Sequence, residues 1–304
     1  MEKIEFYKNR SLGERFSAAA EFIRQNWKVL CKIILIPAIP LALLQGYFQQ
    51  NFIGEYISLV RSTVQGESIF DPQNLYGFYT SVGMYFLVYL VYTTILYAVS
   101  GALMSRYEAG LLSRDTTLKD ISRKTISNIG KLLLIGFLMG LMLLVLYIVL
   151  IVLVVMFANV PALIFIAVIL FFIACAAIMP PMLLTYFPAF FRGASAAKSI
   201  KEAFILGFKN WGSTVVVMLI VSFAIGMVSS ILQIPYIIWL VLDNVFLYND
   251  PANIVSYVLS IVSSLAYAFV TPLTLVFFAF HYFSIAEKEE GISIQSKIEE
   301  FDNL

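Results

Sequence analysis

Six long apolar runs alternate with shorter polar segments along this chain of 304 residues. A helix needs about 20 predominantly apolar residues to cross the hydrocarbon core of a bilayer, and each run reaches that length. The pattern therefore predicts an all-α membrane protein with six transmembrane helices. These spans are expected at residues 29–48, 77–104, 132–157, 161–187, 214–235 and 254–283. The fifth span either ends at Pro235 or continues to residue 242.

A basic amphipathic segment precedes the first, third and fifth of these runs. In the clearest example, residues 195–211, bulky apolar side chains recur at helical spacing and the lysines lie off that stripe. The stripe consists of Ile200, Phe204, Phe208 and Trp211. Residues 11–28 and 117–131 follow the same pattern. We expect three surface helices, which end before their spans begin, around Asn26, Asn128 and Asn210.

Pairs of hydroxyl and acidic residues three positions apart mark the expected starts of these helices. In such a capping box, each side chain satisfies a backbone N–H group that the first helical turn leaves free. The expected pairs are Ser11 with Glu14, Thr117 with Asp120, and Ser199 with Glu202. Short helices are also expected in the loop at residues 53–64 and in the tail at residues 294–301.

The surface helices divide the chain into three similar units, at residues 11–104, 117–187 and 195–283. Each unit is a surface helix followed by a transmembrane hairpin. Because each hairpin returns to the side on which it starts, the units would be parallel repeats. Leucine-rich spans flanked by lysine also resemble one another by chance, so that alternative stays open. With a charged tail at residues 284–304, the units form one polytopic domain over residues 1–304.

The distribution of charge predicts how the chain lies in the membrane. Only 13% of the residues are charged and 61% are hydrophobic, which is typical of a polytopic membrane protein. All Lys and Arg residues except Arg61 lie in the two termini, in the connectors that contain the surface helices, or at Lys32, just inside the first span. By the positive-inside rule, both termini face the cytoplasm, and a bacterial-type cytoplasmic membrane is the expected location.

The basic surface helices also carry the residues that we expect to contact anionic lipid headgroups or a membrane or cytoplasmic protein partner. The alternative is that these charges only anchor the topology. The candidate contact residues are Arg15, Arg24, Lys28, Arg123, Lys124, Lys198, Lys201, Lys209, Trp27 and Trp211. Nucleic acid is not an expected partner.

The residues needed for catalysis inside a membrane are missing from the sequence pattern. It contains no HExxH motif, and no pair of acidic residues falls within the spans. The one histidine, His281, is expected to lie at the membrane interface beside Tyr282, since a single imidazole forms neither a dyad nor a metal site. We therefore expect no enzymatic activity, no cofactor and no metal.

A small-molecule or lipid transporter is the main functional alternative. Proline breaks helices and frees carbonyl groups that can bind a substrate or ion. The candidate helix breaks are Pro37, Pro40, Pro180, Pro181, Pro235 and Pro272. Further polar contacts are expected from Gln45, Thr185, Gln233 and Thr271. Against transport, the only ionisable candidate inside a span is Lys32, which can reach the cytoplasmic surface.

Small residues spaced four apart predict where helices approach closely. Gly136 and Gly140 form a GxxxG motif in the third span, and Ser222, Gly226 and Ser230 follow the same spacing in the fifth. Both stripes are expected to pack inside the bundle, with a dimer interface as the alternative.

The region from the fourth span to the fifth resembles a broad group of bacterial six-helix membrane proteins. The matching positions are Pro181, Gly193, Ser195, Ala197, Ser199, Phe204, Lys209 and Trp211. The group includes the membrane domain fused to some glycerophosphodiester phosphodiesterases, whose catalytic domain has no counterpart here. The resemblance implies a membrane platform without chemistry. The expected function is therefore that of a non-catalytic scaffold or accessory protein.

Overall fold

The computed structural model describes residues 3–65, 72–245 and 254–292. In these ranges the regular secondary structure is entirely α-helical. The expected helix at residues 294–301 lies outside the described residues. The helices are α1 (Leu12–Val64), α2 (Pro72–Glu108), α3 (Leu118–Met156), α4 (Pro161–Leu183), α5 (Tyr186–Phe191), α6 (Ala196–Lys209), α7 (Trp211–Val245) and α8 (Ile254–Glu290).

Six of these helices are long and apolar enough to cross a membrane, namely α1, α2, α3, α4, α7 and α8. The chain therefore has the composition of a multi-pass membrane protein. The α7 helix continues through Pro235, which decides between the two expected ends of the fifth span.

Two of the three surface helices do not end where the sequence pattern predicts. In α1 and α3 the amphipathic segment runs into the span as one helix, so the predicted ends at Asn26 and Asn128 are wrong. The side chain of Asn26 donates a hydrogen bond to the carbonyl of Phe22, 2.9 Å away, and so supports the helix instead of ending it. Only α6 is a separate helix, capped at its C-terminus by Asn210. The expected loop helix at residues 53–64 is the end of α1.

Most of the candidate proline breaks are also wrong. The α1 helix continues through Pro37 and Pro40, and α7 and α8 continue through Pro235 and Pro272. Bilayer-spanning helices tolerate proline when neighbouring groups satisfy the freed carbonyls. Only the pair at positions 180 and 181 lies near a helix end, because α4 stops at Leu183 and α5 follows at once.

Two of the three predicted capping boxes are confirmed. The backbone N–H of Ser11 donates to the Glu14 carboxylate at 2.7 Å, and that of Thr117 donates to Asp120 at 2.7 Å. The third pairing is wrong, because Ser195 is the N-cap of α6. Ser199 is instead buried inside α6, where its hydroxyl donates to the carbonyl of Thr185 at 2.6 Å.

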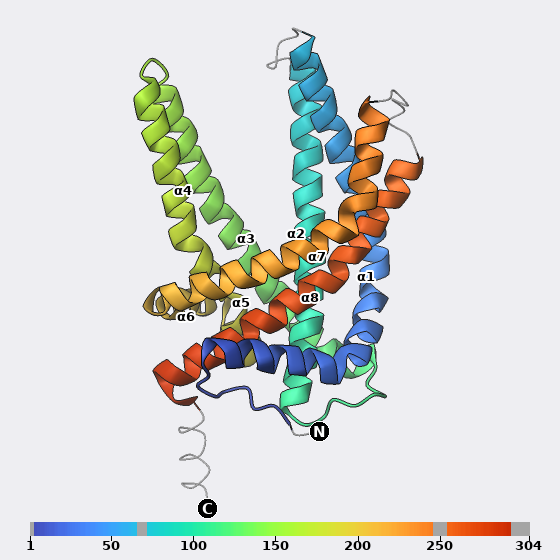
Figure 1. Cartoon of the computed structure of the whole chain (residues 1–304), viewed down its shortest axis with the longest axis vertical. Coiled ribbons are helices and arrows are strands. Elements are labelled where there is room, and N and C mark those ends of the chain that lie inside the picture. Colours follow the sequence, from blue (N-terminus) through green and yellow to red (C-terminus); the bar gives the residue numbers. More distant parts are fainter. Residues whose placement is uncertain (1–2, 66–71, 246–253, 293–304) are drawn as a thin grey trace, which may run out of the picture.

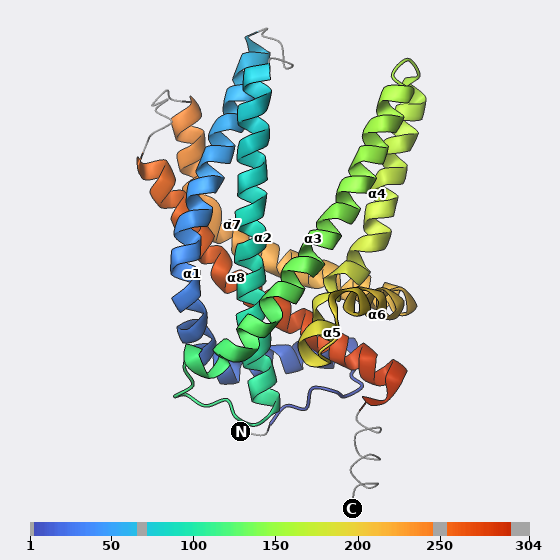
Figure 2. The same cartoon turned by 180° about the vertical axis from the view of Figure 1, so that it is seen from behind.

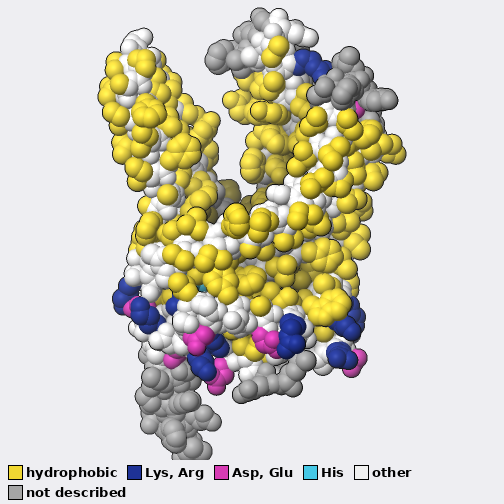
Figure 3. Space-filling view, viewed as in Figure 1, with side chains coloured by type: hydrophobic (Ala, Val, Ile, Leu, Met, Phe, Trp, Pro, Cys, Tyr) yellow, Lys and Arg dark blue, Asp and Glu magenta, His cyan; other side chains and the backbone are white. Residues whose placement is uncertain are grey.

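The long helices form two arms that rise from a common base (Figures 1 and 2). We call the end near the two termini the base and the opposite end the far end. One arm contains α1, α2, α7 and α8, and the other is the α3–α4 hairpin, which leans away from it. Figure 3 shows the opening between the arms, with hydrophobic side chains on both. In the most apolar stretch of α1 and of α8, 44% and 50% of the residues are buried. In the corresponding stretches of α3 and α4, only 6% are buried.

A cluster of aromatic rings holds the base together. Phe6, from the segment before α1, stacks on Phe283 of α8 with ring centroids 4.7 Å apart. Phe191 of α5 meets the same Phe283 ring edge-on, also at 4.7 Å. Tyr7 packs beside them, and burial raises its pKa to about 12, with nearby Glu108 acting in the same direction. Buried aromatic contacts of this kind contribute more than their apolar area alone. They join the segment before α1 to α5 and α8.

The glycines at which a neighbouring backbone comes close are not the predicted ones. A Cβ on Gly140 or on Gly226 would meet no atom within 4 Å, so neither glycine allows a close approach. At Gly46, by contrast, a Cβ would lie 2.7 Å from the backbone of Ile261 in α8. At Gly207 it would lie 2.7 Å from the Cα of Pro181 in α4. Of the glycines in the predicted stripes, only Gly136 is in close contact, against the flexible side chain of Leu90.

The contact between α4 and α7 depends on a carbonyl group that a proline sets free. Pro181 has no N–H group to donate to the carbonyl of Ala177, four residues earlier. The indole N–H of Trp211 donates to that carbonyl at 3.1 Å. Trp211 therefore links the start of α7 to the end of α4.

Replacing Trp211 with phenylalanine is expected to lower the free energy of unfolding by about 1 kcal/mol, because the ring is kept and the indole hydrogen bond is lost. Unfolding of the detergent-solubilised protein by SDS, followed by circular dichroism, measures the change. Trp27→Phe is the matched control, since Trp27 is exposed and its ring contacts the Lys28 ammonium. Equal losses in the two variants would contradict the role of the hydrogen bond.

Candidate functional site

A polar pocket of about 680 Å³ lies at the far end of the larger arm. Residues from α1, α2, α7 and α8 line it, so it forms where the first and third predicted hairpins meet. Its lining is Phe48, Gln50, Asn51, Gly54, Glu55, Ile57, Ser58, Arg61, Tyr76, Gly77, Thr80, Ser81, Met84, Leu240, Asp243 and Tyr257. A pocket of this size is large enough for a small organic molecule.

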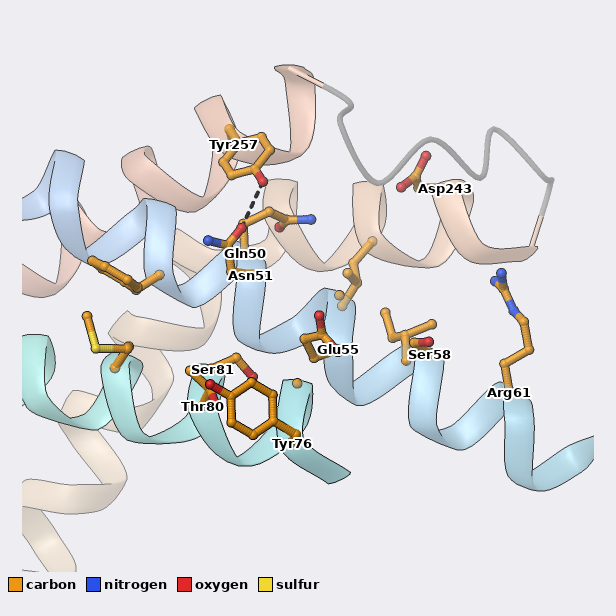
Figure 4. Close-up of a pocket in the computed structure, with 16 residues that line it drawn as sticks. Gln50, Asn51, Glu55, Ser58, Arg61, Tyr76, Thr80, Ser81, Asp243 and Tyr257 are labelled. Atoms are coloured by element: carbon orange, nitrogen blue, oxygen red, sulfur yellow. Dashed lines mark hydrogen bonds between the residues drawn. The ribbon is translucent and has the colours of Figure 1, made fainter. Parts of the chain in front are cut away.

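Three charged side chains line this pocket. Glu55 and Arg61 belong to the last turns of α1, and Asp243 belongs to α7. Figure 4 shows Arg61 toward one end of the pocket, Tyr257 toward the other, and Glu55 between them. The absence of a side chain at Gly77 makes room for the Glu55 carboxylate, because a Cβ there would lie 2.8 Å from Oε2.

Hydrogen bonds between helices fix the inner wall of the pocket. The hydroxyl of Tyr257 donates to the side-chain oxygen of Asn51 at 2.9 Å (Figure 4). The hydroxyl of Tyr236 on α7 donates to Gln50 in the same way, at 3.1 Å. Both tyrosines thus hold amide side chains of α1 in place.

Polar side chains continue from the pocket toward the middle of the arm, between α1, α2 and α8. Ser264 donates to Gln49 at 3.4 Å, and the hydroxyls of Tyr89 and Tyr267 lie 3.1 Å apart. The hydroxyl of Tyr92 donates to the Ser264 carbonyl at 2.7 Å. Gln45 lies in the same region, and its buried side-chain oxygen has no hydrogen-bond partner. We call this series of contacts the polar seam. The polar seam places tyrosine and serine hydroxyls and glutamine amides between these helices, where apolar side chains would be expected.

The sequence pattern does not predict the pocket, because most of its α1 residues lie between the first two expected spans, where a polar loop is expected. Glu55 and Arg61 therefore looked like loop charges. The available signal was the predicted helix at residues 53–64. Joined to the preceding span, that helix carries Asn51, Glu55 and Ser58 four and three residues apart, which places them along one face.

The candidate lipid-contact residues gather at the base, where Figure 3 shows most of the Lys and Arg side chains. Several of them are engaged by acids: Arg24 with Glu21 at 2.7 Å, Lys198 with Glu202 at 3.7 Å, and Lys209 with Glu289. The side chains of Trp27, Lys28, Arg123, Lys124, Lys201 and Trp211 are exposed. Lipid or partner contact by these residues stays a prediction.

Arg15 is the exception among the basic candidates, and its expected contact with lipid is wrong. It is only 8% exposed. Its Nε donates to the carbonyl of Arg10 at 3.0 Å, and its Nη1 lies 2.8 Å from Nδ1 of His281. The side chain therefore points into the base and away from the membrane surface.

His281 is also placed differently from the expectation of an interfacial residue, because it is fully buried. Its Nε2 lies 3.0 Å from the hydroxyl of Thr214. That hydroxyl donates a hydrogen bond to the carbonyl of Asn210. The hydroxyl must then accept a hydrogen bond from the Nε2–H group, which leaves Nδ1 free to accept a hydrogen bond from Arg15. The imidazole is therefore neutral and joins α1, α7 and α8 at the base.

The polar residues expected to serve transport are scattered. Gln45 belongs to the polar seam, whereas Thr271 donates to the carbonyl of Tyr267 on its own helix at 2.8 Å. Thr185 likewise donates to the carbonyl of Met182 at 2.7 Å. Gln233 is half-buried, and Lys32 is exposed. Over the described residues, no three His, Cys, Asp or Glu side chains come together as a metal site.

Comparison of the chain with models of known protein families, with curated proteins and with solved structures found no match.

Proposed function

We propose that this chain is a non-catalytic protein of a bacterial-type cytoplasmic membrane that binds an amphipathic molecule, a lipid or a small membrane-soluble compound. The observation that carries the proposal is the pocket between α1, α2, α7 and α8. It combines charged and amide side chains with apolar ones such as Phe48, Met84 and Leu240. A ligand with a polar head and an apolar tail matches this mixture.

The position of the pocket supports the same proposal. It lies at the far end of helices that are long enough to span a bilayer, which is the depth of the headgroup region. The predicted orientation places the base, rich in Lys and Arg, in the cytoplasm, and so places the pocket at the outer face. A lipid of the outer leaflet would meet it with its headgroup.

Filling the pocket is expected to remove the bound amphiphile. Ser81, on α2, lines the pocket, and a tryptophan in its place would occupy much of the space. The full chain is purified in mild detergent, and its co-purifying lipids and small molecules are quantified by mass spectrometry. We expect Ser81→Trp to lose a molecule that the unmodified chain retains in stoichiometric amount.

Ser222→Trp is the matched control, since Ser222 is exposed on α7 away from the pocket. It makes the same chemical change on a membrane-spanning helix. Retention of the same molecules by both variants, with both folded, would contradict binding in the pocket.

A scaffold or accessory role is the second candidate, and the α3–α4 hairpin favours it. This hairpin contacts the other helices at the base and then leaves the larger arm (Figure 2). Apolar side chains such as Phe137 and Phe172 are more than half exposed along it. Photocrosslinkers placed at these two positions in cells test the idea: capture of one stoichiometric membrane protein supports the scaffold, and capture of lipid alone opposes it.

A further inference from the structure

We propose that the far-end pocket recognises a zwitterion, with its ammonium group held by Glu55 and its phosphate or carboxylate held by Arg61. This inference rests on the proposed function and narrows its ligand to one class. The corresponding membrane molecule is a phospholipid with an amine in its headgroup. The same charges would suit a free zwitterion such as phosphoethanolamine, so the test separates the two sources.

The charge of the lining favours an ammonium group over an anion. Among the described residues, two carboxylates and one guanidinium line the pocket, which gives this lining a negative formal charge. A purely anionic headgroup would therefore be repelled on entry. A metal ion is a poorer fit than an ammonium, because within the described part of the chain no third ligand of the His, Cys, Asp or Glu type joins these acids.

The aromatic lining supports the same choice. Tyr76 is 76% exposed, and Tyr257 is held at the inner wall by its hydrogen bond to Asn51. Tyrosine rings attract ammonium groups through their negative faces, and binding sites for alkylated ammonium groups commonly combine such rings with acids. In Figure 4, Tyr76 and Tyr257 lie on opposite sides of the α1 segment that carries Glu55.

Arg61 supplies the second half of the recognition. It lies far from the basic segments, at the end of the membrane helices where the positive-inside rule disfavours Lys and Arg. Among the described residues, neither Glu55 nor Arg61 forms an ion pair with the other or with a third side chain. A guanidinium binds phosphate or carboxylate through two parallel hydrogen bonds.

The spacing of these two residues suits one ligand. Six positions along α1 separate Glu55 from Arg61, which corresponds to about 9 Å along the helix axis. The Arg61 side chain is long, flexible and exposed. Its rotamers can bring the guanidinium closer to Glu55, toward the length of a headgroup that carries an amine and a phosphate.

The test measures ligand affinity for the full chain in detergent by isothermal titration calorimetry. The probes are short-chain phosphatidylethanolamine, short-chain phosphatidylglycerol and soluble phosphoethanolamine. We expect the ethanolamine lipid to bind and the glycerol lipid to bind about tenfold more weakly or worse. Equal or tighter binding of the glycerol lipid would overturn the inference. Binding of phosphoethanolamine as tight as that of the lipid assigns the site to a free zwitterion, and much weaker binding assigns it to a lipid headgroup.

Two substitutions assign the charges. Glu55→Gln and Arg61→Gln are each expected to weaken binding of the ethanolamine lipid about tenfold or more. Their matched controls are Asp115→Asn and Arg114→Gln, which change exposed charges near the base. Unchanged affinity in both pocket variants would overturn the inference. If Ser81→Trp still abolished binding in that case, the pocket would remain an amphiphile site, and the proposed function would stand without the zwitterion.

Discussion

Replacing His281 with leucine is expected to lower the free energy of unfolding by about 3 kcal/mol, the largest effect of any single side chain in the base. The imidazole accepts from Arg15 at 2.8 Å and donates to Thr214 at a distance of 3.0 Å. Leucine fills a similar volume but offers no acceptor. The Arg15 guanidinium would then keep its charge in a buried place with one remaining hydrogen bond, to the carbonyl of Arg10.

The measurement is SDS-induced unfolding of the purified chain in mixed micelles. A second substitution separates the loss of this hydrogen bond from a general packing defect. Replacing both partners of a buried polar pair with apolar groups is far less costly than removing one. We therefore expect Arg15→Met together with His281→Leu to recover most of the stability that His281→Leu loses.

The matched control for Arg15 is Arg24→Met, on the same amphipathic part of α1. Arg24 is exposed and pairs with Glu21 one turn away, so we expect no measurable change. If the double variant were as unstable as His281→Leu, or if Arg24→Met were as harmful as His281→Leu, the buried contact would not be what holds α1 to α8.

Gly46→Ala is expected to have the second largest effect. It should lower the free energy of unfolding by about 2 kcal/mol. The added Cβ would lie 2.7 Å from both the Cα and the backbone N of Ile261. Backbone atoms cannot rotate away, so α1 and α8 would have to separate. That movement would also disturb the 2.9 Å hydrogen bond from the Ser260 hydroxyl to the Gly46 carbonyl.

Gly226→Ala in α7 is the control, because a Cβ there meets nothing within 4 Å. Alanine also favours the helix over glycine, so this variant is expected to be as stable as the unmodified chain or slightly more stable. The free energy of unfolding in SDS is compared for both variants. Equal losses at the two positions would show that Gly46 does not mark a close helix contact.

The sequence predicted local features well, since these depend on neighbours in the chain. The apolar runs predicted the six long helices, because the length of an apolar run does not depend on the partners of the helix. The pairs Ser11 with Glu14 and Thr117 with Asp120 form as predicted, because both members lie in one helical turn. The threefold repeat and the orientation of the termini stay predictions.

The sequence did not predict features in which a residue's partner lies far away in the chain. Arg15 and Arg24 both lie in a basic amphipathic segment, yet one is buried against His281, 266 positions away, and the other is exposed. Likewise, spacing alone could not show that Gly46 rather than Gly140 has a helix backbone against it. Ser199 looked like an N-cap, but it lies where α5 packs on α6.

The amino-acid sequence by itself determined that the chain is helical, where its long apolar helices lie and which segments are basic, because these properties follow from composition and short-range periodicity. Only the tertiary structure decided that α3 and α4 lean away from the larger arm, that His281 is buried against Arg15, and that Glu55, Arg61 and Asp243 line one pocket. Asp243 lies more than 180 residues from Arg61, and only the packing of α7 on α8, and of α8 on α1 and α2, places them in one pocket.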